Sequence, residues 1–220
     1  MQQEKLYIPS LDREVSTLAQ IADDGAPWVV LAHGAGADMN HQHMQSLADM
    51  LGGLGLNTLR FNFPYKEDGG HRTDKLEVCL ATIDAVLASP CLTSAPYLAG
   101  HSFGGRMMTH WAAEHGDADI AGLILFSFPL HGAKKPDTRR AAHLPDITYP
   151  MLFLSGERDN MADPALMNTL AESLPQAHLT WLETADHSYK PLKRSRQRTD
   201  TVYEEAAESL QQWLSGQPRH

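Results

Sequence analysis

The residues Gly100-His101-Ser102-Phe103-Gly104 spell the pattern G-x-S-x-G, which can hold a reactive serine. A serine hydroxyl is a weak nucleophile, so its attack on a carbonyl carbon requires a base that takes its proton. Glycines on both sides of the serine allow the sharp strand-to-helix turn that projects the hydroxyl from a sheet. The same residues also fit an ordinary serine in a tight turn. The rest of the chain must therefore supply a base, an orienting acid and donors for an oxyanion.

His187, in the stretch "LETADHSYK", is the candidate for this base. It follows the last predicted strand, and in a fold with this kind of turn the acid and then the histidine come later in the chain than the serine. Most of the other histidines lie within predicted helices or near the starts of strands, from which they cannot reach the carboxyl edge of a sheet. The alternative is a solvated loop histidine.

Four carboxylates near the ends of the last two predicted strands could orient that histidine: Glu157, Asp159, Asp163 and Asp186. Asp159 is preferred because it follows Gly156 in a G-x-x-D arrangement just after a strand. Its carboxylate would hold the imidazole of His187 in one tautomer and stabilise the imidazolium that forms. Asp163 is expected to cap the next helix. The remaining two stay open as alternatives.

Two backbone N–H groups are expected to form the oxyanion hole. One belongs to Phe103, at the start of the helix after the serine, where unpaired donors favour an anion. The other belongs to Ala35 in the glycine-rich stretch "HGAGAD", which follows an apolar strand. A phosphate-binding loop is disfavoured because the stretch lacks both G-x-G-x-x-G and a Walker-type lysine. His33 is expected to form a hydrogen bond within this loop.

The elements that must position these residues alternate along the chain. Strands are predicted within 5–9, 15–22, 27–38, 57–64, 96–102, 120–129, 149–159 and 177–186, and helices within 43–55, 73–89, 103–116, 163–175 and 200–214. Thr73 or Asp74 is expected to cap the second helix, and Gly116 to close the third.

Alternating strands and helices predict an α/β fold: a mostly parallel sheet with helices on both faces. The first two strands, joined by a turn at Leu11-Asp12-Arg13, predict an antiparallel hairpin at the edge. The stretch between Pro129 and Tyr149 is too short for a large cap domain. Without a repeat or a linker, residues 1–220 are expected to form a single domain.

The composition excludes several classes of protein. The chain has 220 residues and a formal net charge of -9, which argues against nucleic-acid binding. Apolar runs stay short of the ~20 residues that span a membrane, and the first residues lack a signal-peptide pattern. Cys79 and Cys91 lack C-x-x-C spacing and are expected to be free thiols. These features together predict a cytoplasmic protein.

The stretches "HGAGADMNHQHM", "LRFNFPY", "GHSFGGR" and "ADHSYK" occur in this order along nearly the whole chain. In this combination the sequence resembles the α/β-hydrolase superfamily. More narrowly, it resembles the small dienelactone-hydrolase-like predicted hydrolases, whose eukaryotic relatives include a testis-expressed protein and a subunit of a histone-acetyltransferase complex. The resemblance implies an α/β-hydrolase fold and acyl transfer to water. Unlike dienelactone hydrolase, this chain has Ser102 and not a cysteine at the nucleophile position.

Basic residues stand out in two stretches of this acidic chain. The first holds Lys134, Lys135, Arg139 and Arg140 and could meet an acidic substrate or simply form a solvated face. The second, Lys190 to Arg198, could be a mobile surface loop or could bind an anion or a partner.

Three further histidines have weaker functional claims. His41 and His43 lack the additional ligands that a metal site needs, and they are expected to line the mouth of the site. His101 is expected to pack on the sheet beside the serine.

The sequence therefore predicts a serine hydrolase that cleaves a small ester or thioester and needs no cofactor and no metal. Ser102 would be the nucleophile, His187 the base and Asp159 the orienting acid, with a small-molecule acyl compound as the substrate. The alternative is an interaction module on a hydrolase scaffold. A third possibility is acyl transfer to an acceptor other than water.

Overall fold

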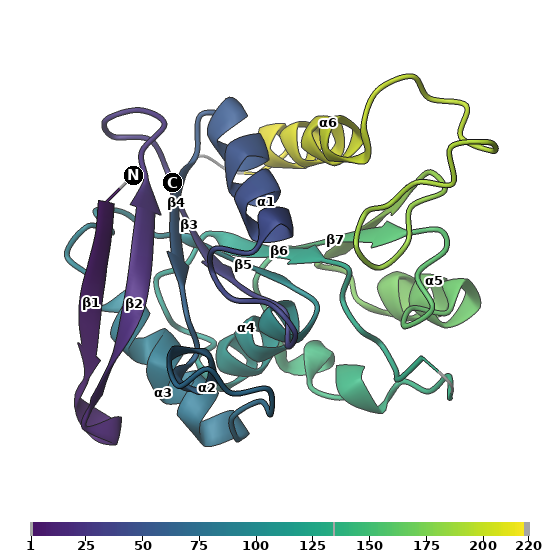
Figure 1. The fold of residues 1–220 in the computed structure, drawn as a ribbon. Coiled ribbons are helices and arrows are strands. Elements are labelled where there is room, and N and C mark those ends of the chain that lie inside the picture. The colour runs from purple at the N-terminus through teal and green to yellow at the C-terminus, as the bar shows by residue number, and fades with distance from the viewer. Residues whose placement is uncertain (1, 134, 218–220) are drawn as a thin grey trace.

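The computed structural model describes residues 2–133 and 135–217, and within them an eight-stranded sheet organises the chain (Figure 1). The strands are β1 (Gln2–Ile8), β2 (Arg13–Gln20), β3 (Trp28–Ala32), β4 (Asn57–Phe61), β5 (Tyr97–His101), β6 (Gly122–Phe126), β7 (Met151–Gly156) and β8 (Ala177–Leu182). Their order in the sheet is β1-β2-β4-β3-β5-β6-β7-β8. Strands β3 to β8 pair in parallel, whereas β2 pairs antiparallel with both β1 and β4. The predicted mostly parallel sheet with an antiparallel N-terminal edge is confirmed.

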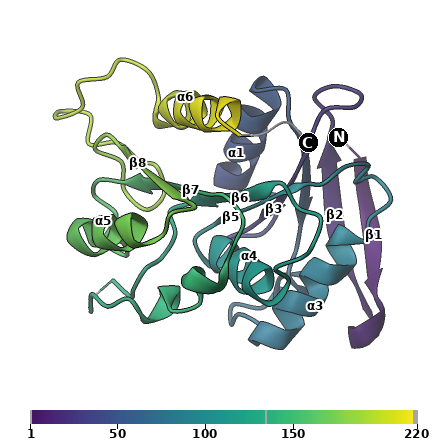
Figure 2. The same ribbon diagram turned by 180° about the vertical axis from the view of Figure 1, so that it is seen from behind.

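Helices cover both faces of this sheet (Figures 1 and 2). They are α1 (Gln42–Gly53), α2 (Pro64–Glu67), α3 (Leu76–Leu87), α4 (Phe103–Glu114), α5 (Pro164–Ser173) and α6 (Val202–Ser215). Helices α1 and α6 pack on one face, and α3, α4 and α5 pack on the other. Three short 3₁₀ turns, η1 (Pro9–Leu11), η2 (Arg139–Ala141) and η3 (Leu144–Asp146), lie in the connections. The predicted two-sided helical cover is confirmed.

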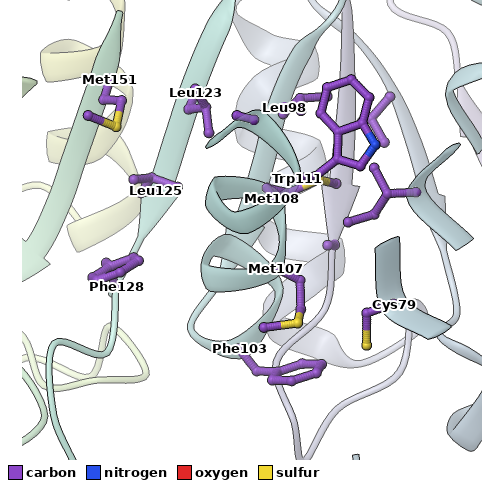
Figure 3. Packing of buried hydrophobic residues seen from close by; sticks show 14 of the residues in the cluster. Cys79, Leu98, Phe103, Met107, Met108, Trp111, Leu123, Leu125, Phe128 and Met151 are labelled. Carbon is purple, nitrogen blue, oxygen red and sulfur yellow. The ribbon is translucent and has the colours of Figure 1, made fainter. Parts of the chain in front are cut away.

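The central strands are apolar on both sides because each face is covered. In β6, Leu123 and Leu125 point into the cluster beneath α4, while Ile124 and Phe126 point into the cluster beneath α1 and α6. All four side chains are fully buried. Figure 3 shows the first cluster, in which side chains of α4 pack against β5 and β6. This packing fixes the position of the helix that begins after Ser102.

Two predicted helix ends were wrong. Helix α3 begins at Leu76 with Lys75 at its N-cap, so neither proposed residue caps it. Asp74 instead accepts the backbone N–H of Tyr65 at 2.9 Å. Helix α4 ends at Glu114, before the glycine that was expected to close it. The short helix α2 was not predicted, because a single turn leaves no periodic pattern.

The connection between β6 and β7 is short, and η2 and η3 are the helical turns described in it. The prediction that a large cap domain is missing is confirmed for the part of the chain that the structure describes. In that same part, no helix is long and apolar enough to cross a membrane.

Candidate active site

Ser102 occupies a sharp turn between β5 and α4. Its backbone has φ 52° and ψ -113°, outside the regions that side-chain-bearing residues usually adopt. The turn is held because the Ser102 N–H donates to the carbonyl oxygen of Phe126 on β6, at 2.9 Å. Such local strain persists only where the surrounding structure enforces it. The serine thus stands at the carboxyl edge of the sheet, and its side chain is half-buried.

Glycines make this turn possible because strand and helix approach too closely for a side chain. A Cβ atom on Gly104 would lie 2.5 Å from the carbonyl oxygen of Ala32, at the end of β3. A Cβ atom on Gly100 would overlap the backbone of Gly105. The sequence pattern therefore reflects a real steric requirement at both positions.

His187 lies between the serine and a carboxylate. Its Nε2 atom is 2.8 Å from Ser102 Oγ, and its Nδ1 atom is 2.7 Å from Asp159 Oδ2. A carboxylate can only accept from Nδ1–H, which leaves Nε2 free to accept the serine hydroxyl proton. The His187 side chain is 21% exposed, whereas that of Asp159 is fully buried. The structure thus brings the three predicted residues into one hydrogen-bonded line.

Asp159 is held by its own turn at the end of β7. Its N–H donates to the carbonyl oxygen of Gly156 at 3.0 Å, and its Oδ1 atom accepts the N–H of Met161 at 2.8 Å. A Cβ atom on Gly156 would overlap the carbonyl oxygen of Ala185. This close approach of the segments after β7 and β8 brings the carboxylate to the loop that carries the histidine.

The other three candidate carboxylates have different partners. Glu157 accepts the N–H of Thr184 at 2.8 Å, and Asp186 accepts the N–H of Lys190 at 3.0 Å. Asp163 caps α5 through its side chain, as the sequence predicts. Each of them therefore stabilises local backbone.

The two proposed oxyanion donors belong to two segments that approach each other closely, the start of α4 and the loop after β3. Phe103 is the first residue of α4, so its N–H belongs to those without an intrahelical partner. Ala35 lies in the loop after β3, where Ala37 N–H donates to the carbonyl oxygen of Gly34 at 3.0 Å. A Cβ atom on Gly104 would lie 2.7 Å from the carbonyl oxygen of His33, which shows how closely this loop approaches the start of α4.

His33 supports this loop. It is fully buried, its Nε2 atom accepts the N–H of Phe63 at 3.1 Å, and its Nδ1 atom is 2.9 Å from the carbonyl oxygen of Gly34. Burial lowers the pKa of His33 to about 4, so the ring is neutral near pH 7. The predicted structural role of this histidine is confirmed.

His101 was predicted only to pack on the sheet. The prediction did not include its hydrogen bond to the loop that carries His187. Its Nε2 atom lies 2.9 Å from the carbonyl oxygen of His187. His43 contributes a second ring that packs against it, with centroids 4.4 Å apart. The position of His101 at the end of a strand, beside the serine, was the available signal in the sequence. The partner could not be found because it lies 86 residues away in the chain.

A hollow of about 410 Å³ lies at the first basic stretch; its lining includes Lys135, Arg139 and Arg140. Arg139 is already paired with Asp137 at 2.8 Å, and Arg140 donates to the carbonyl oxygen of His131 at 3.0 Å. Lys134 lies outside the described residues. An acidic substrate at this stretch stays a prediction.

Two arginines of the second basic stretch are paired with carboxylates. The Arg196 side chain is only 5% exposed and pairs with Glu205 at 2.8 Å. Arg198 pairs with Asp200 at 2.6 Å and with Glu208 at 2.7 Å. The interpretation as a mobile surface loop is wrong for the Arg196 side chain, because Glu205 of α6 and Asp200 just before α6 pair with it.

Neither the histidines at the start of α1 nor the thiols form a cluster of ligands. His41 accepts the N–H of His43 at 3.2 Å and so caps α1. His43 is buried and does not line the mouth of the site as expected. Among the described residues, no three histidine, cysteine, aspartate or glutamate side chains are grouped so that they could hold a metal ion. Cys79 and Cys91 are both free, and burial raises the pKa of the Cys79 thiol to about 12.

Comparison with solved structures shows the same fold in several proteins. Est1E from Butyrivibrio proteoclasticus matches with a TM-score of 0.75 and 17% identity over 98% of each chain. Dienelactone hydrolase from Anabaena variabilis matches with a TM-score of 0.75 and 17% identity over 99% of each chain. XC6422 from Xanthomonas campestris, described as an a/b serine hydrolase without lid, matches with a TM-score of 0.72 and 20% identity, covering 100% of this chain and 96% of that one.

The sequence also matches the model of a protein family. The family described as alpha/beta hydrolase domain matches residues 25–215, which include the turn at Ser102 and the loops that carry Asp159 and His187. The match leaves out the antiparallel hairpin of β1 and β2 and the last residues. Since it spans most of the sequence, the chain belongs to the alpha/beta hydrolase domain family.

Proposed function

We propose that this protein is a serine hydrolase that cleaves a small ester or thioester through an acyl-enzyme on Ser102. The observation that carries the proposal is the imidazole of His187, which lies 2.8 Å from Ser102 Oγ and 2.7 Å from Asp159 Oδ2. A buried carboxylate, an imidazole and a hydroxyl in this order are the groups that acyl transfer requires. The role of each residue below is part of the proposal.

In the first half-reaction, Ser102 Oγ attacks the substrate carbonyl carbon while His187 Nε2 takes the hydroxyl proton. Asp159 stabilises the resulting imidazolium through its bond to Nδ1. The carbonyl oxygen becomes an oxyanion and accepts the N–H groups of Phe103 and Ala35. When the tetrahedral intermediate collapses, the bond to the leaving group breaks and His187 returns the proton to the leaving oxygen or sulfur.

In the second half-reaction, water attacks the acyl-enzyme. His187 takes a proton from the water, and the same N–H groups hold the second oxyanion. Collapse then breaks the acyl–oxygen bond, releases the acid and returns the proton to Ser102. Positioned acid–base groups contribute about 10²- to 10⁴-fold to such rates. One oxyanion donor contributes a further ~10²- to 10³-fold.

The proteins of similar fold support hydrolysis by what their names say. They include Est1E, which was solved with ferulic acid bound, a dienelactone hydrolase and an a/b serine hydrolase without lid. A fold hosts many functions, so these names guide the choice of assay and do not identify the substrate. A cytoplasmic location also stays a prediction. The free thiols of Cys79 and Cys91 support it, because they fit a reducing compartment.

A panel of activated esters with acyl chains of graded length tests the proposal. We expect wild type to hydrolyse the short neutral esters, and Ser102→Ala to lose about 10⁴-fold or more of kcat. Matched thioesters in the panel compare ester with thioester hydrolysis, and one anionic hemisuccinate ester compares an acidic acyl group with the neutral ones. Product analysis separates hydrolysis from transfer to another acceptor.

Failure of the proposal has a clear form in this assay. If folded wild type turns over none of the esters, or if Ser102→Ala retains the rate, the serine is not the nucleophile. Such an outcome would favour the alternative of an interaction module on this scaffold.

A further inference from the structure

His101 is the last residue of β5, directly before Ser102, and its ring reaches across to the loop that carries His187. Its Nε2 atom lies 2.9 Å from the carbonyl oxygen of His187. A carbonyl oxygen only accepts, so Nε2 carries the proton and donates. Burial lowers the pKa of His101 to about 4, which keeps the ring neutral near pH 7.

The His101 ring is fixed on its other sides as well. His43 packs against it in a T-shaped contact with centroids 4.4 Å apart, and Tyr203 Oη lies 2.6 Å from His43 Nδ1. A Cβ atom on Gly34 would lie 2.8 Å from His101 Nδ1, so the loop after β3 closes the remaining side. His43 of α1, which is held by Tyr203 of α6, and the loop after β3 thus set the direction in which Nε2–H points.

The loop that receives this hydrogen bond is also anchored to β7, because the side chain of Tyr189 is buried and its Oη donates to the carbonyl oxygen of Leu154 at 3.1 Å. Its backbone is bonded within the loop, through Tyr189 N–H to the carbonyl of Asp186 at 3.0 Å and through Asp186 N–H to the carbonyl of Lys190 at 3.1 Å. None of these three bonds ties His187 to β5, the strand that carries the serine. The bond from His101 does, because its donor is the residue next to Ser102.

We propose that His101 is a positioning residue: it anchors the main chain of His187 to β5 and so holds the imidazole within reach of both Ser102 and Asp159. The inference deepens the proposed hydrolase function and rests on it. A displacement of about 1 Å at a reacting group can lower a rate by about 10²-fold. One hydrogen bond to the backbone can therefore have a large effect on catalysis with little effect on substrate binding.

Two variants of similar size separate the donor from the packing. His101→Leu removes the N–H, whereas the side-chain amide of His101→Gln retains a donor that can reach the same carbonyl oxygen. With p-nitrophenyl butyrate, we expect His101→Leu to lower kcat about 10- to 100-fold with KM changed less than about threefold. His101→Gln is expected to keep kcat within about fivefold of wild type.

Tyr149→Phe is the matched control. Tyr149 Oη donates to the backbone carbonyls of His115 and Ala118, at 2.7 and 2.9 Å, at the other end of α4. The control loses side-chain-to-backbone hydrogen bonds of the same kind, so its midpoint of thermal unfolding should fall while kcat stays at the wild-type value. Equal loss of kcat in His101→Leu and His101→Gln, or a loss that follows the unfolding midpoint across all three variants, would overturn the proposal.

A second measurement reports on position without turnover. In ¹⁵N-histidine NMR spectra, the Nδ1–H proton of His187 should give a sharp downfield signal in wild type and His101→Gln, and a broadened or missing one in His101→Leu. An unchanged signal in His101→Leu would overturn the positioning role. Because this readout needs no substrate, it distinguishes a failure of the inference from a failure of the proposed hydrolysis.

Discussion

At the scale of single residues, the buried carboxylate of Asp159 makes two different contacts. One oxygen accepts from His187 at 2.7 Å, and the other accepts the backbone N–H of Met161 at 2.8 Å. An amide in its place could donate to Nδ1 and would then favour the tautomer whose Nε2 atom carries the proton. That tautomer cannot accept the proton of Ser102.

We therefore expect Asp159→Asn to lower kcat by about 10⁴-fold while the fold and KM change little. Steady-state kinetics on the best ester of the panel, with circular dichroism as a check of folding, measure this. Glu157→Gln is the control, because that carboxylate bonds to backbone after β8. A smaller loss in Asp159→Asn than in the control would contradict the assigned role.

At the scale of elements, the serine depends on how closely α4 approaches the ends of the strands. A Cβ atom on Gly104 would lie 2.5 Å from a backbone carbonyl, whereas one on Gly116, just after α4, would meet nothing within 4 Å. We expect Gly104→Ala to lower the free energy of unfolding by about 2 kcal/mol or more and to abolish hydrolysis, because overpacking shifts backbone. Gly116→Ala should be close to neutral in both urea unfolding and activity. Wild-type behaviour of Gly104→Ala would show that the close approach is not needed.

The connection between β8 and α6 carries another prediction at this scale. Arg196 is buried with Glu205, whose side chain would keep an unpaired charge if the guanidinium were removed. We expect Arg196→Met to lower the free energy of unfolding by about 3 kcal/mol. The exposed Arg194 is the control, and Arg194→Met should change the free energy of unfolding by less than about 0.5 kcal/mol. Equal unfolding curves for the two variants would place Arg196 in solvent.

At the scale of the whole molecule, histidines whose pKa is lowered by burial link the stability of the fold to pH. Burial lowers the pKa of His33 and His101 to about 4 and that of His43 to about 3, from an ordinary value of 6.5. Between pH 6.5 and 4 the unfolded chain binds protons at these rings while the folded chain does not. The stability that these neutral rings contribute is therefore fully present above pH 6.5, and it is lost as the pH falls through this window.

His43→Phe tests this link because it keeps a ring in place and removes one titrating group. Each group contributes about 1.4 kcal/mol per pH unit, so the loss of stability between pH 7 and pH 5 should be smaller in the variant by up to about 2 kcal/mol. Urea unfolding at the two pH values measures the difference. The same loss in both proteins would mean that the buried ring is not the group that titrates.

Much of this architecture could be predicted from the sequence because its determinants are local. Apolar runs and glycines placed the strands, and the turn at Ser102 followed from five adjacent residues. The contacts of His101 and Arg196 could not be predicted, because each depends on a loop whose place is set by residues far along the chain. The sheet draws its strands from residues 2 to 182, which supports the proposal of a single domain.

The central claim is that Ser102 is a nucleophile activated by His187, and a fluorophosphonate probe tests it most directly. We predict that the probe labels the folded wild-type protein once, at Ser102, as read by mass spectrometry of the peptides, and that Ser102→Ala abolishes labelling. Ser127→Ala is the control variant. Ser127 has nearly the same unusual backbone φ as Ser102, 51°, and its substitution should leave labelling unchanged. Failure to label the folded protein, or equal labelling of Ser102→Ala, would contradict the account.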